Sequence, residues 1–304
     1  MKRYVPTLLL VIVCVAGFWY ASGHSFFKKE DENAPQAYNT LQKDAITAIS
    51  IHTGMGDVEL ERQGEAWQMV KPQAVPLNRY GVDDWLDSFT GLMHKGIVDS
   101  EPADLEPFGL KEPPRIFTVK TADGSTRTLR VGTVLPVPDY LYAKWQDRDE
   151  VVKLSTSAID PLTRTALDFM DTTVFQFSDS DVVKLEVEYK GSMYSLQNKA
   201  DSADGVKWQV GETEWKPEDA GTLFGKLHAI ATQELVKPAG EVALSKPDLK
   251  VTIQMKEKST VYVGQVNEGK LWVAQEQGPW AFSLPVATAD EIVKLFQQAP
   301  AAAG

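Results

Sequence analysis

The sequence predicts an α+β fold made of two tandem repeats, each a mainly antiparallel sheet with two helices, after one N-terminal transmembrane helix. Three observations carry this prediction: an uncharged apolar run near the N-terminus, one order of strand and helix patterns that occurs twice, and turn signals between neighbouring strands. At 304 residues the chain has room for one to three domains of about 100–200 residues each.

The apolar run, residues 5–23, has the length of a membrane span. At about 1.5 Å per residue it gives roughly 28 Å of helix, close to the bilayer core of about 30 Å. Lys2 and Arg3 precede the run, so the positive-inside rule keeps the N-terminus in the cytoplasm. We therefore expect a single-pass protein of a bacterial cytoplasmic membrane, with the bulk of the chain extracytoplasmic.

Two other interpretations of this run stay open. Ala21 and Gly23 form an acceptable signal-peptide cleavage site before His24, although the bulky aromatic residues 18–20 directly precede it. A lipoprotein would use Cys14, but the residues before it lack the small side chains that lipoprotein processing requires. Anchoring is the favoured interpretation, and Cys14 is then a small apolar residue of the span.

The remaining chain divides by composition and pattern. After the anchor, residues 1–23, we expect a charged linker over 24–44, a first repeat over 45–172, a second repeat over 173–298 and a tail over 299–304.

The first repeat begins with strands of alternating polarity and continues through an amphipathic helix to four further strands and a closing helix. Its predicted elements are the strands 46–51 and 58–62, Trp67, a loop with Pro72, a helix with Val82, Trp85, Leu86, Phe89 and Met93 on one face, the strand 97–98, the loop 110–113, the strands 116–120, 129–132, 141–144 and 151–154, and a helix over 157–169. The Asp123-Gly124 turn predicts a hairpin, and hence antiparallel pairing.

The second repeat shows the same order, which indicates an internal duplication. Its predicted elements are the strands 183–189 and 193–196, Trp208, a helix with Leu223, Leu227, Ile230 and Ala231, the strand 235–236, the loop 244–247, the strands 249–253, 261–264, 271–274 and 281–284, and a helix over 287–297. In this alignment Gly264 is the counterpart of Gly132.

Charge and cysteine content exclude several function classes. The chain has 31 Lys and Arg against 42 Asp and Glu, a net charge of −11, which argues against nucleic-acid binding and against a peripheral protein held by anionic lipid. Residues 24–304 contain no cysteine, so disulfides, cysteine metal sites and thiol catalysis are excluded there. A cysteine-free exported part suits a bacterial cell envelope.

The first repeat contains a set of structural residues at characteristic positions: Trp67, Pro72, the helix 82–93, Phe108-Gly109-Leu110, Pro113, the strand at Ile116 and Val131-Gly132. This set resembles the bacterial family DUF4340, a domain of unknown function. The likeness covers most of residues 46–300 and is weaker in the second repeat, where Gly109 has no counterpart before Leu244. It implies exported, membrane-tethered proteins with tandem domains, associated with ABC-transporter and gliding-motility-type gene clusters, and it supplies no catalytic residues.

The histidines are the first candidates for a metal site. His24, His52, His94 and His228 are far apart, and no two have the spacing of metal ligands. His94 and His228 are predicted at equivalent helix ends, where a solvated or charged imidazole is favoured. We therefore predict no metal-binding histidine.

Acidic clusters are the second candidates. Asp179-Ser180-Asp181 and the run 147–150 lack the glycine and the final glutamate of a calcium loop, so both are predicted to be solvated turns. Residues 201–205 are predicted to form a flexible hairpin tip.

Aromatic and apolar residues offer two further possibilities. Trp67 and Trp208 could stack on sugars, but their matched positions beside strands favour roles in packing. The Pro-interrupted apolar loop 134–140 could dock on a partner or cover a sheet edge, and the sequence does not choose between these.

No nucleophile elbow, phosphate loop or dinucleotide-binding glycine set occurs. We therefore predict no enzyme, no catalytic, cofactor-binding or metal residues and no cofactor. The expected function is that of a non-catalytic accessory or scaffold subunit of an ABC-type transport or envelope-assembly complex, with ABC-transporter subunits as partners, the membrane bound through residues 5–23, and no nucleic acid. The alternatives are a cell-wall or polysaccharide-binding module and an envelope hydrolase with a site assembled from distant residues.

Overall fold

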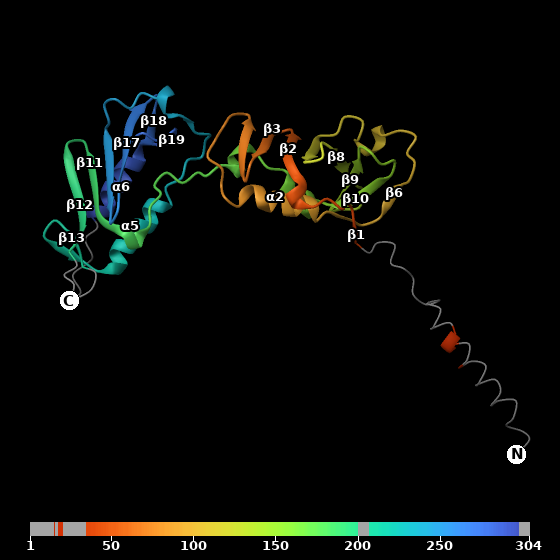
Figure 1. Ribbon diagram of the computed structural model, residues 1–304, viewed down its shortest axis with the longest axis horizontal. Helices are drawn as coiled ribbons and strands as arrows, with labels where there is room; N and C mark the ends of the chain where they lie inside the picture. Colours follow the sequence, from red (N-terminus) through yellow and green to blue (C-terminus); the bar gives the residue numbers. More distant parts are fainter. Residues whose placement is uncertain (1–14, 16–17, 21–34, 200–206, 298–304) are drawn as a thin grey trace, which may run out of the picture. The chain divides into compact units, whose positions relative to one another are not determined.

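Two large antiparallel β-sheets make up most of the fold (Figure 1). The computed structural model describes residues 15, 18–20, 35–199 and 207–297. Neighbouring strands form antiparallel ladders, and the helices are few and short. The predicted α+β class is therefore confirmed.

The first sheet has eight strands, in the order β4-β3-β2-β7-β8-β9-β10-β6. These are β4 (Ala66–Lys71), β3 (Gly56–Gln63), β2 (Ile46–Thr53), β7 (Arg115–Thr121), β8 (Thr126–Val134), β9 (Tyr140–Trp145), β10 (Val151–Ser155) and β6 (Ile97–Asp99). The predicted Asp123-Gly124 turn joins β7 to β8, and an Asp123 carboxylate oxygen accepts the Ser125 backbone N–H at 2.9 Å.

The second sheet has nine strands, in the order β14-β13-β12-β11-β16-β17-β18-β19-β15. These are β14 (Thr213–Trp215), β13 (Trp208–Val210), β12 (Ser192–Asn198), β11 (Val182–Tyr189), β16 (Leu249–Met255), β17 (Ser259–Asn267), β18 (Lys270–Gln275), β19 (Trp280–Pro285) and β15 (Lys237–Pro238). Apart from the added edge strand β14, the order repeats that of the first sheet, which agrees with the two-part layout expected from the sequence.

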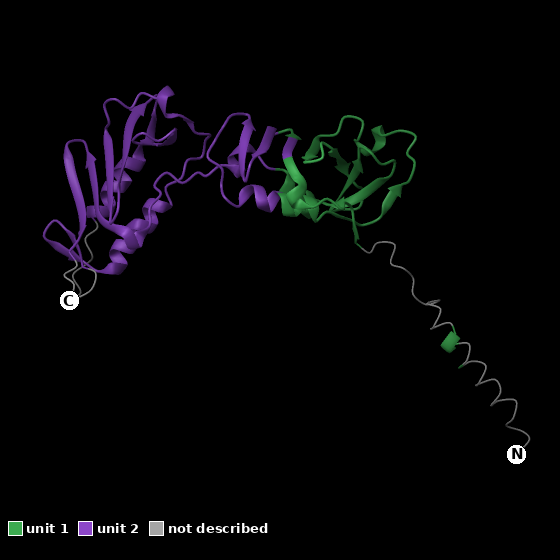
Figure 2. Cartoon of the chain, viewed as in Figure 1, with its two compact units in different colours: residues 1–47, 52–54, 86–163 green, residues 48–51, 55–85, 164–304 purple. Residues whose placement is uncertain are grey.

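The chain divides into two compact units (Figure 2). One contains residues 1–47, 52–54 and 86–163, and the other contains residues 48–51, 55–85 and 164–304. Strands β6 to β10 belong to the first unit, and the whole second sheet belongs to the second.

Each repeat begins before its first long strand. The 3-10 turn η1 (Lys43–Ala45) leads into β2, and η4 (Asp179–Asp181) leads into β11. Each of these later elements starts 136 residues after its counterpart. Residues 36–45 therefore correspond to residues 172–181.

The backbone hydrogen bonds upstream of these turns also match. The Tyr38 N–H donates to the Leu92 carbonyl at 2.9 Å, and the Val174 N–H donates to the Ile230 carbonyl at 3.2 Å. In both repeats an opening segment is thus bonded to the chain that follows the first helix.

Tyr38 ties the opening segment to the first repeat. Strand β1 (Gln36–Ala37) pairs with β5 (Met93–His94), and the following Tyr38 is only 1% exposed. The indole N–H of Trp145 donates to the Tyr38 carbonyl at 2.8 Å, and the Trp145 backbone N–H donates to the Tyr38 hydroxyl at 3.2 Å. Within the predicted linker, 24–44, residues from 36 onward are therefore folded, whereas 24–34 lie outside the described residues.

The first helix of each repeat ends earlier than the apolar spacing predicts. Helix α2 (Gly81–Thr90) stops before Met93, which lies in β5 and is 51% exposed. The Leu92 N–H donates three residues back, to Phe89, and its carbonyl accepts from Tyr38, so the helical bonding pattern is not continued.

In the second repeat, helix α5 (Pro217–His228) ends before the predicted Ile230 and Ala231. Ala231 instead forms an isolated antiparallel bridge with Thr173. The residues beyond the helix keep apolar side chains, which is why their spacing resembled a continued helix.

The continuous helix predicted over 157–169 is wrong. The chain forms α3 (Thr156–Ile159), the 3-10 turn η3 (Asp160–Leu162) and α4 (Ala166–Phe169). Pro161 cannot donate a helical hydrogen bond, and Thr163 has a ψ of 74°, which is outside the helical region. The matching helix of the second repeat, α6 (Ala287–Gln297), has the predicted bounds.

Four strands were not predicted with their observed bounds. Trp67 and Trp208, which the sequence placed beside strands, lie within β4 and β13, and β14 was not expected. Strand β15 begins two residues after the predicted strand 235–236. The two- and three-residue strands β13, β14 and β15 leave too little alternation to be recognised.

The predicted equivalence of Gly132 and Gly264 is wrong by one residue. Arg115, which begins β7, is paired with Val131, whereas Leu249, which begins β16, is paired with Gly264. Gly264 therefore matches Val131. Gly132 lies in a register irregularity between Val131 and Val134, where the second repeat has the single residue Gln265.

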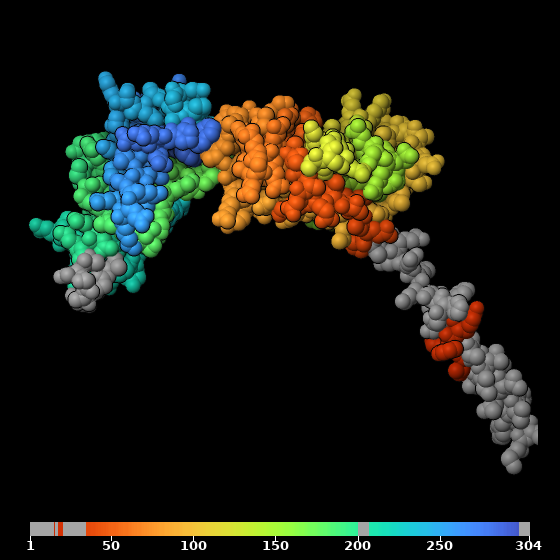
Figure 3. Space-filling view, viewed as in Figure 1, coloured from red at the N-terminus to blue at the C-terminus, as the bar shows by residue number. Residues whose placement is uncertain are grey.

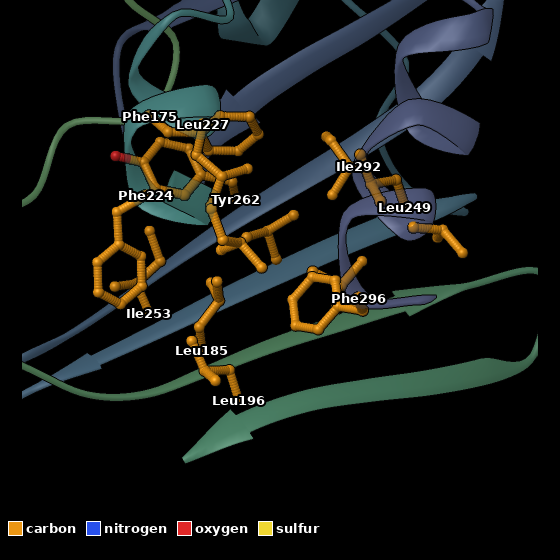
Figure 4. Close-up of a cluster of buried hydrophobic side chains, with 14 of the residues drawn as sticks. Phe175, Leu185, Leu196, Phe224, Leu227, Leu249, Ile253, Tyr262, Ile292 and Phe296 are labelled. Atoms are coloured by element: carbon orange, nitrogen blue, oxygen red, sulfur yellow. The ribbon is translucent and has the colours of Figure 1, made fainter. Parts of the chain in front are cut away.

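The core of the second repeat lies on one face of its sheet, under α5 and α6. Phe224 and Leu227 from α5 and Ile292 and Phe296 from α6 point toward strand residues such as Leu185 (Figure 4). The space-filling view shows the outer surface of this repeat in green, cyan and blue (Figure 3). The other face of the sheet carries a smaller cluster of Trp272, Ala274 and Ala281 with Ala239, Val242 and Leu244.

Among the described residues, none of the helices combines the length and the apolar character that crossing a bilayer requires. Of the predicted span over 5–23, only residues 15 and 18–20 are described. The predicted hairpin tip 201–205 and tail 299–304 also lie outside the described residues.

Candidate functional site

The second repeat contains an open pocket of about 400 Å³. Its walls come from the segment after α5, the start of β18, the end of β19 and the first turns of α6. Polar residues of the wall are Gln233, Glu234, Lys270, Ser283, Thr288 and Glu291, and apolar ones are Ala229, Ile230, Ala231, Leu284 and Pro285. This volume and mixed lining are typical of small-ligand sites, which measure roughly 300–1,000 Å³.

Glu234 organises the polar side of the pocket. Lys270 Nζ lies 2.6 Å from Glu234 Oε1 and 2.5 Å from Oε2. The buried Ser283 hydroxyl donates to Oε2 at 3.3 Å. The buried Thr232 hydroxyl donates to the Glu234 carbonyl at 3.1 Å and accepts the Glu234 N–H at 3.2 Å. Backbone and side chain of Glu234 are therefore both held in place.

The charge state of Glu234 decides what this arrangement can do. The hydrogen bond from Lys270 lowers the pKa of the Glu234 carboxyl below its ordinary value. A general base works best with a pKa near the working pH, so an ionised, strongly paired carboxylate is a poor partner for activating the Ser283 hydroxyl. The wall of the pocket therefore presents a carboxylate and an ammonium group beside the Ser283 hydroxyl.

The matching place in the first repeat has different chemistry. By ladder register, Tyr140 corresponds to Lys270 and Lys153 corresponds to Ser283. Lys153 Nζ lies 5.7 Å from the centre of the Tyr140 ring, a cation–π contact in place of the carboxylate network. The two repeats thus share a fold but present different groups.

Glu234→Gln is expected to lower the free energy of unfolding by at most about 1 kcal/mol, because half-exposed ion pairs contribute about 0–1 kcal/mol. The lowered pKa means that the wild-type ion pair stabilises the fold above the ordinary carboxyl pKa and is lost as the pH falls through the lowered one. The difference from wild type should therefore be present at pH 7 and shrink in acid.

Urea unfolding of the full-length chain at several pH values measures this difference. Glu291→Gln is the matched control, since Glu291 lines the same pocket at an exposed position. A loss for Glu234→Gln that does not change with pH would show that the ion pair is not its cause.

The structure places His228 at the predicted end of α5, beside one of the acidic clusters. Its Nε2 lies 2.8 Å from Asp179 Oδ1, and its ring stacks on Phe177 at 4.2 Å between ring centres. This histidine therefore joins the helix end to the 3-10 turn η4.

The other histidines lie elsewhere. His94 is in β5 rather than at a helix end, so its predicted equivalence to His228 is wrong. Partial burial lowers the pKa of His94 below its ordinary value. His52 is exposed on β2, and His24 lies outside the described residues.

The acidic clusters form turns whose carboxylates pair with basic side chains. Asp181 lies 3.5 Å from Lys256 Nζ. In the run 147–150, Asp147 pairs with Arg127, and Glu150 lies 3.5 Å from Arg148. In the part of the chain that the structure describes, no three His, Cys, Asp or Glu residues are grouped as metal ligands.

Trp208 is buried and packs edge-to-face on Phe224, at 5.4 Å between ring centres. Trp67 is half-buried on β4. The apolar loop 134–140 joins β8 to β9, with Val134 and Val137 exposed.

Sequence reasoning did not find the Glu234 pocket. Glu234 and Lys270 are 36 residues apart, and neither lies in a motif. Their meeting depends on how the segment after α5 passes the start of β18. No local spacing could have indicated this contact.

Comparison with known proteins gives one match. Residues 67–243 match the family described as "Domain of unknown function (DUF4340)", which is more than half of the chain. The match begins at Trp67, the first residue of the predicted resemblance. No curated protein and no solved structure matches the chain.

Proposed function

The chain belongs to the DUF4340 family of domains of unknown function, and from this premise we propose that it acts by binding, as a membrane-anchored, extracytoplasmic accessory subunit. Its partner in this proposal is an ABC-type transport or envelope-assembly complex. The protein contributes surfaces to that complex and no chemical step.

The observation that carries the proposal is the repetition of one strand order in two sheets. Two related folds in one chain offer two related surfaces, and their joint use raises affinity through effective concentration. The different groups at matched positions, Glu234 with Lys270 in one repeat and Tyr140 with Lys153 in the other, suit two different contacts on one partner.

Membrane anchoring is supported by the uncharged run over residues 5–23 and by the basic residues before it. The Glu234 network supports binding, since a carboxylate and an ammonium group meet at the wall of the pocket.

Crosslinking in cells, followed by purification of the C-terminally tagged full-length chain from gently solubilised membranes, tests the proposal. We expect mass spectrometry to detect enriched permease or ATPase subunits of an ABC-type complex. A matched chain without residues 1–23, exported by another signal, should recover less of them because it is not confined to the membrane.

Recovery of the tagged chain alone would overturn the proposed function. Recovery of cell-wall fragments in place of proteins would instead favour the polysaccharide-binding alternative. Equal recovery of subunits with both chains would contradict the role of the anchor and leave partner binding standing.

A further inference from the structure

In the first repeat, an oxygen atom of a loop caps the start of the helix that follows β10. Ser155, the last residue of β10, pairs with Tyr140, which begins β9. The next residue, Thr156, begins α3 and donates its N–H to the Asp139 carbonyl at 2.9 Å. The β8–β9 loop therefore supplies an acceptor for one of the N–H groups that the start of a helix leaves without a helical partner.

The second repeat does not form this hydrogen bond. By ladder register, the counterparts of Asp139 and Thr156 are Gly269 and Val286. The connection between β17 and β18 has two residues, whereas that between β8 and β9 has five, so Gly269 lies in a tight turn. Among the residues that the structure describes, none accepts a hydrogen bond from the Val286 N–H. The second repeat thus keeps the donor and lacks the matching oxygen atom within these residues.

The Glu234 pocket lies at this helix start. Val286 directly precedes α6 and stands between Pro285 and Thr288, which both line the pocket. The N–H groups in the first turn of this 11-residue helix carry the partial positive charge of the helix dipole. The start of α6 therefore favours a ligand atom that accepts hydrogen bonds.

Thr288 adds a buried hydroxyl to the same wall. It is 6% exposed and lines the pocket, and within the described part of the chain its hydroxyl has no hydrogen-bond partner. Burial of an unpaired hydroxyl costs free energy, which a ligand that bonds to it recovers. Two observations at the start of α6 therefore point to a ligand oxygen, the kind of atom that Asp139 supplies in the first repeat.

The charges of the wall restrict the kind of ligand. Glu234 and Glu291 outnumber Lys270, and Lys270 is already paired with Glu234. Glu291 lies three residues after Thr288, so the two side chains share one face of α6. The carboxylates repel a plain anion, whereas an ammonium group on the same ligand pairs with Glu291. A ligand that carries both charges therefore fits the wall better than an anion alone.

We propose that the Glu234 pocket binds a small zwitterion of the α-amino acid type. Its carboxylate bonds to the start of α6 and to the Thr288 hydroxyl, and its ammonium group faces Glu291. An apolar side chain fits the remaining wall, which includes Ile230 and Leu284. A volume of about 400 Å³ holds a ligand of this size. This ligand site goes beyond the proposed accessory role.

NMR of the full-length chain in detergent, with 13C-labelled isoleucine δ1 methyl groups, tests the inference. Ile230 lines the pocket, and Ile230→Val identifies its resonance by its loss. Titration with L-leucine should shift that resonance saturably. 4-Methylpentanoate lacks the ammonium group and 3-methylbutylamine lacks the carboxylate, so each should bind at least about ten-fold more weakly, as for loss of a hydrogen bond to a charged group.

Two variants of α6 test the individual contacts. Thr288→Val keeps the shape of the side chain and removes the hydroxyl, so leucine binding should weaken about two- to ten-fold, the range for one hydrogen bond. Glu291→Gln, at an exposed position, should weaken it by up to about five-fold and should not weaken the binding of 4-methylpentanoate. Glu218→Gln is the matched control, because Glu218 is exposed on α5 outside the pocket, and it should change nothing.

Absence of an Ile230 shift up to the solubility limit of L-leucine would overturn the inference. Equal binding of 4-methylpentanoate would also overturn it and assign a plain carboxylate, and a shift with maltoheptaose alone would assign a saccharide. Undiminished binding by Thr288→Val would reject the contact with α6. The titration uses the chain without any partner, so its failure leaves the proposed accessory role standing, and failure to recover a partner leaves the titration result standing.

Discussion

Replacement of Tyr38 by alanine is expected to lower the free energy of unfolding of the first repeat by about 3–5 kcal/mol, the range for removal of a buried aromatic side chain. Tyr38 is 1% exposed, and its ring centre lies 5.3 Å from that of Trp145. The same residue accepts two hydrogen bonds from Trp145. The variant loses the ring contacts and leaves the Trp145 backbone N–H without the hydroxyl that accepts it.

Urea unfolding followed by tryptophan fluorescence measures this loss in the full-length chain. Tyr38→Phe keeps the ring and removes only the hydroxyl, so it should cost about 1–3 kcal/mol for one unpaired buried group. Tyr80→Ala is the control, because Tyr80 is 63% exposed and its loss should change stability by less than about 0.5 kcal/mol. A cost below that control for Tyr38→Ala would mean that residues 36–45 are a dispensable linker.

Gly132→Ala is expected to destabilise the first repeat by about 3 kcal/mol or more, at the upper end for overpacking of a rigid site. The new Cβ would lie 2.1 Å from the Phe108 carbonyl oxygen, and backbone cannot yield as a flexible side chain does. The loop of Phe108 must then leave the strand, and the Phe108–Tyr142 contact is lost with it.

The matched control is Gly221→Ala in helix α5, where a Cβ meets nothing within 4 Å. Alanine is the better helix former, so this variant should gain about 0.5–1 kcal/mol in the second repeat. Thermal unfolding of both variants measures the change in stability. We expect a lower unfolding temperature for Gly132→Ala and a higher one for Gly221→Ala. A neutral Gly132→Ala would contradict the close approach of the loop.

The long strands could be predicted because their buried and exposed residues alternate over seven to nine positions, as in β7 and β17. The opening segment could not, because Tyr38 is its single buried apolar residue and a single residue has no period. Its equivalence to residues 172–181 is visible only in the backbone hydrogen bonds. These bonds do not depend on the type of side chain, so the sequence does not reveal them.

The one-residue error at Gly132 has a different cause. Strands β8 and β17 both contain a glycine, and the prediction aligned these two glycines with each other. The register of each ladder is instead set by which side chains face the core. The candidate site was missed for a third reason: Glu234 and Lys270 are 36 residues apart, and only the fold brings them together.

Because the first repeat already begins at β1, the linker between the proposed membrane span and this repeat is short. With residues 5–23 in the bilayer, as proposed, residues 24–35 can reach at most roughly 40 Å even when fully extended. The first repeat then explores only a shallow layer above the membrane. Within that layer it meets proteins embedded in the same bilayer at a far higher local concentration than proteins that diffuse freely outside it.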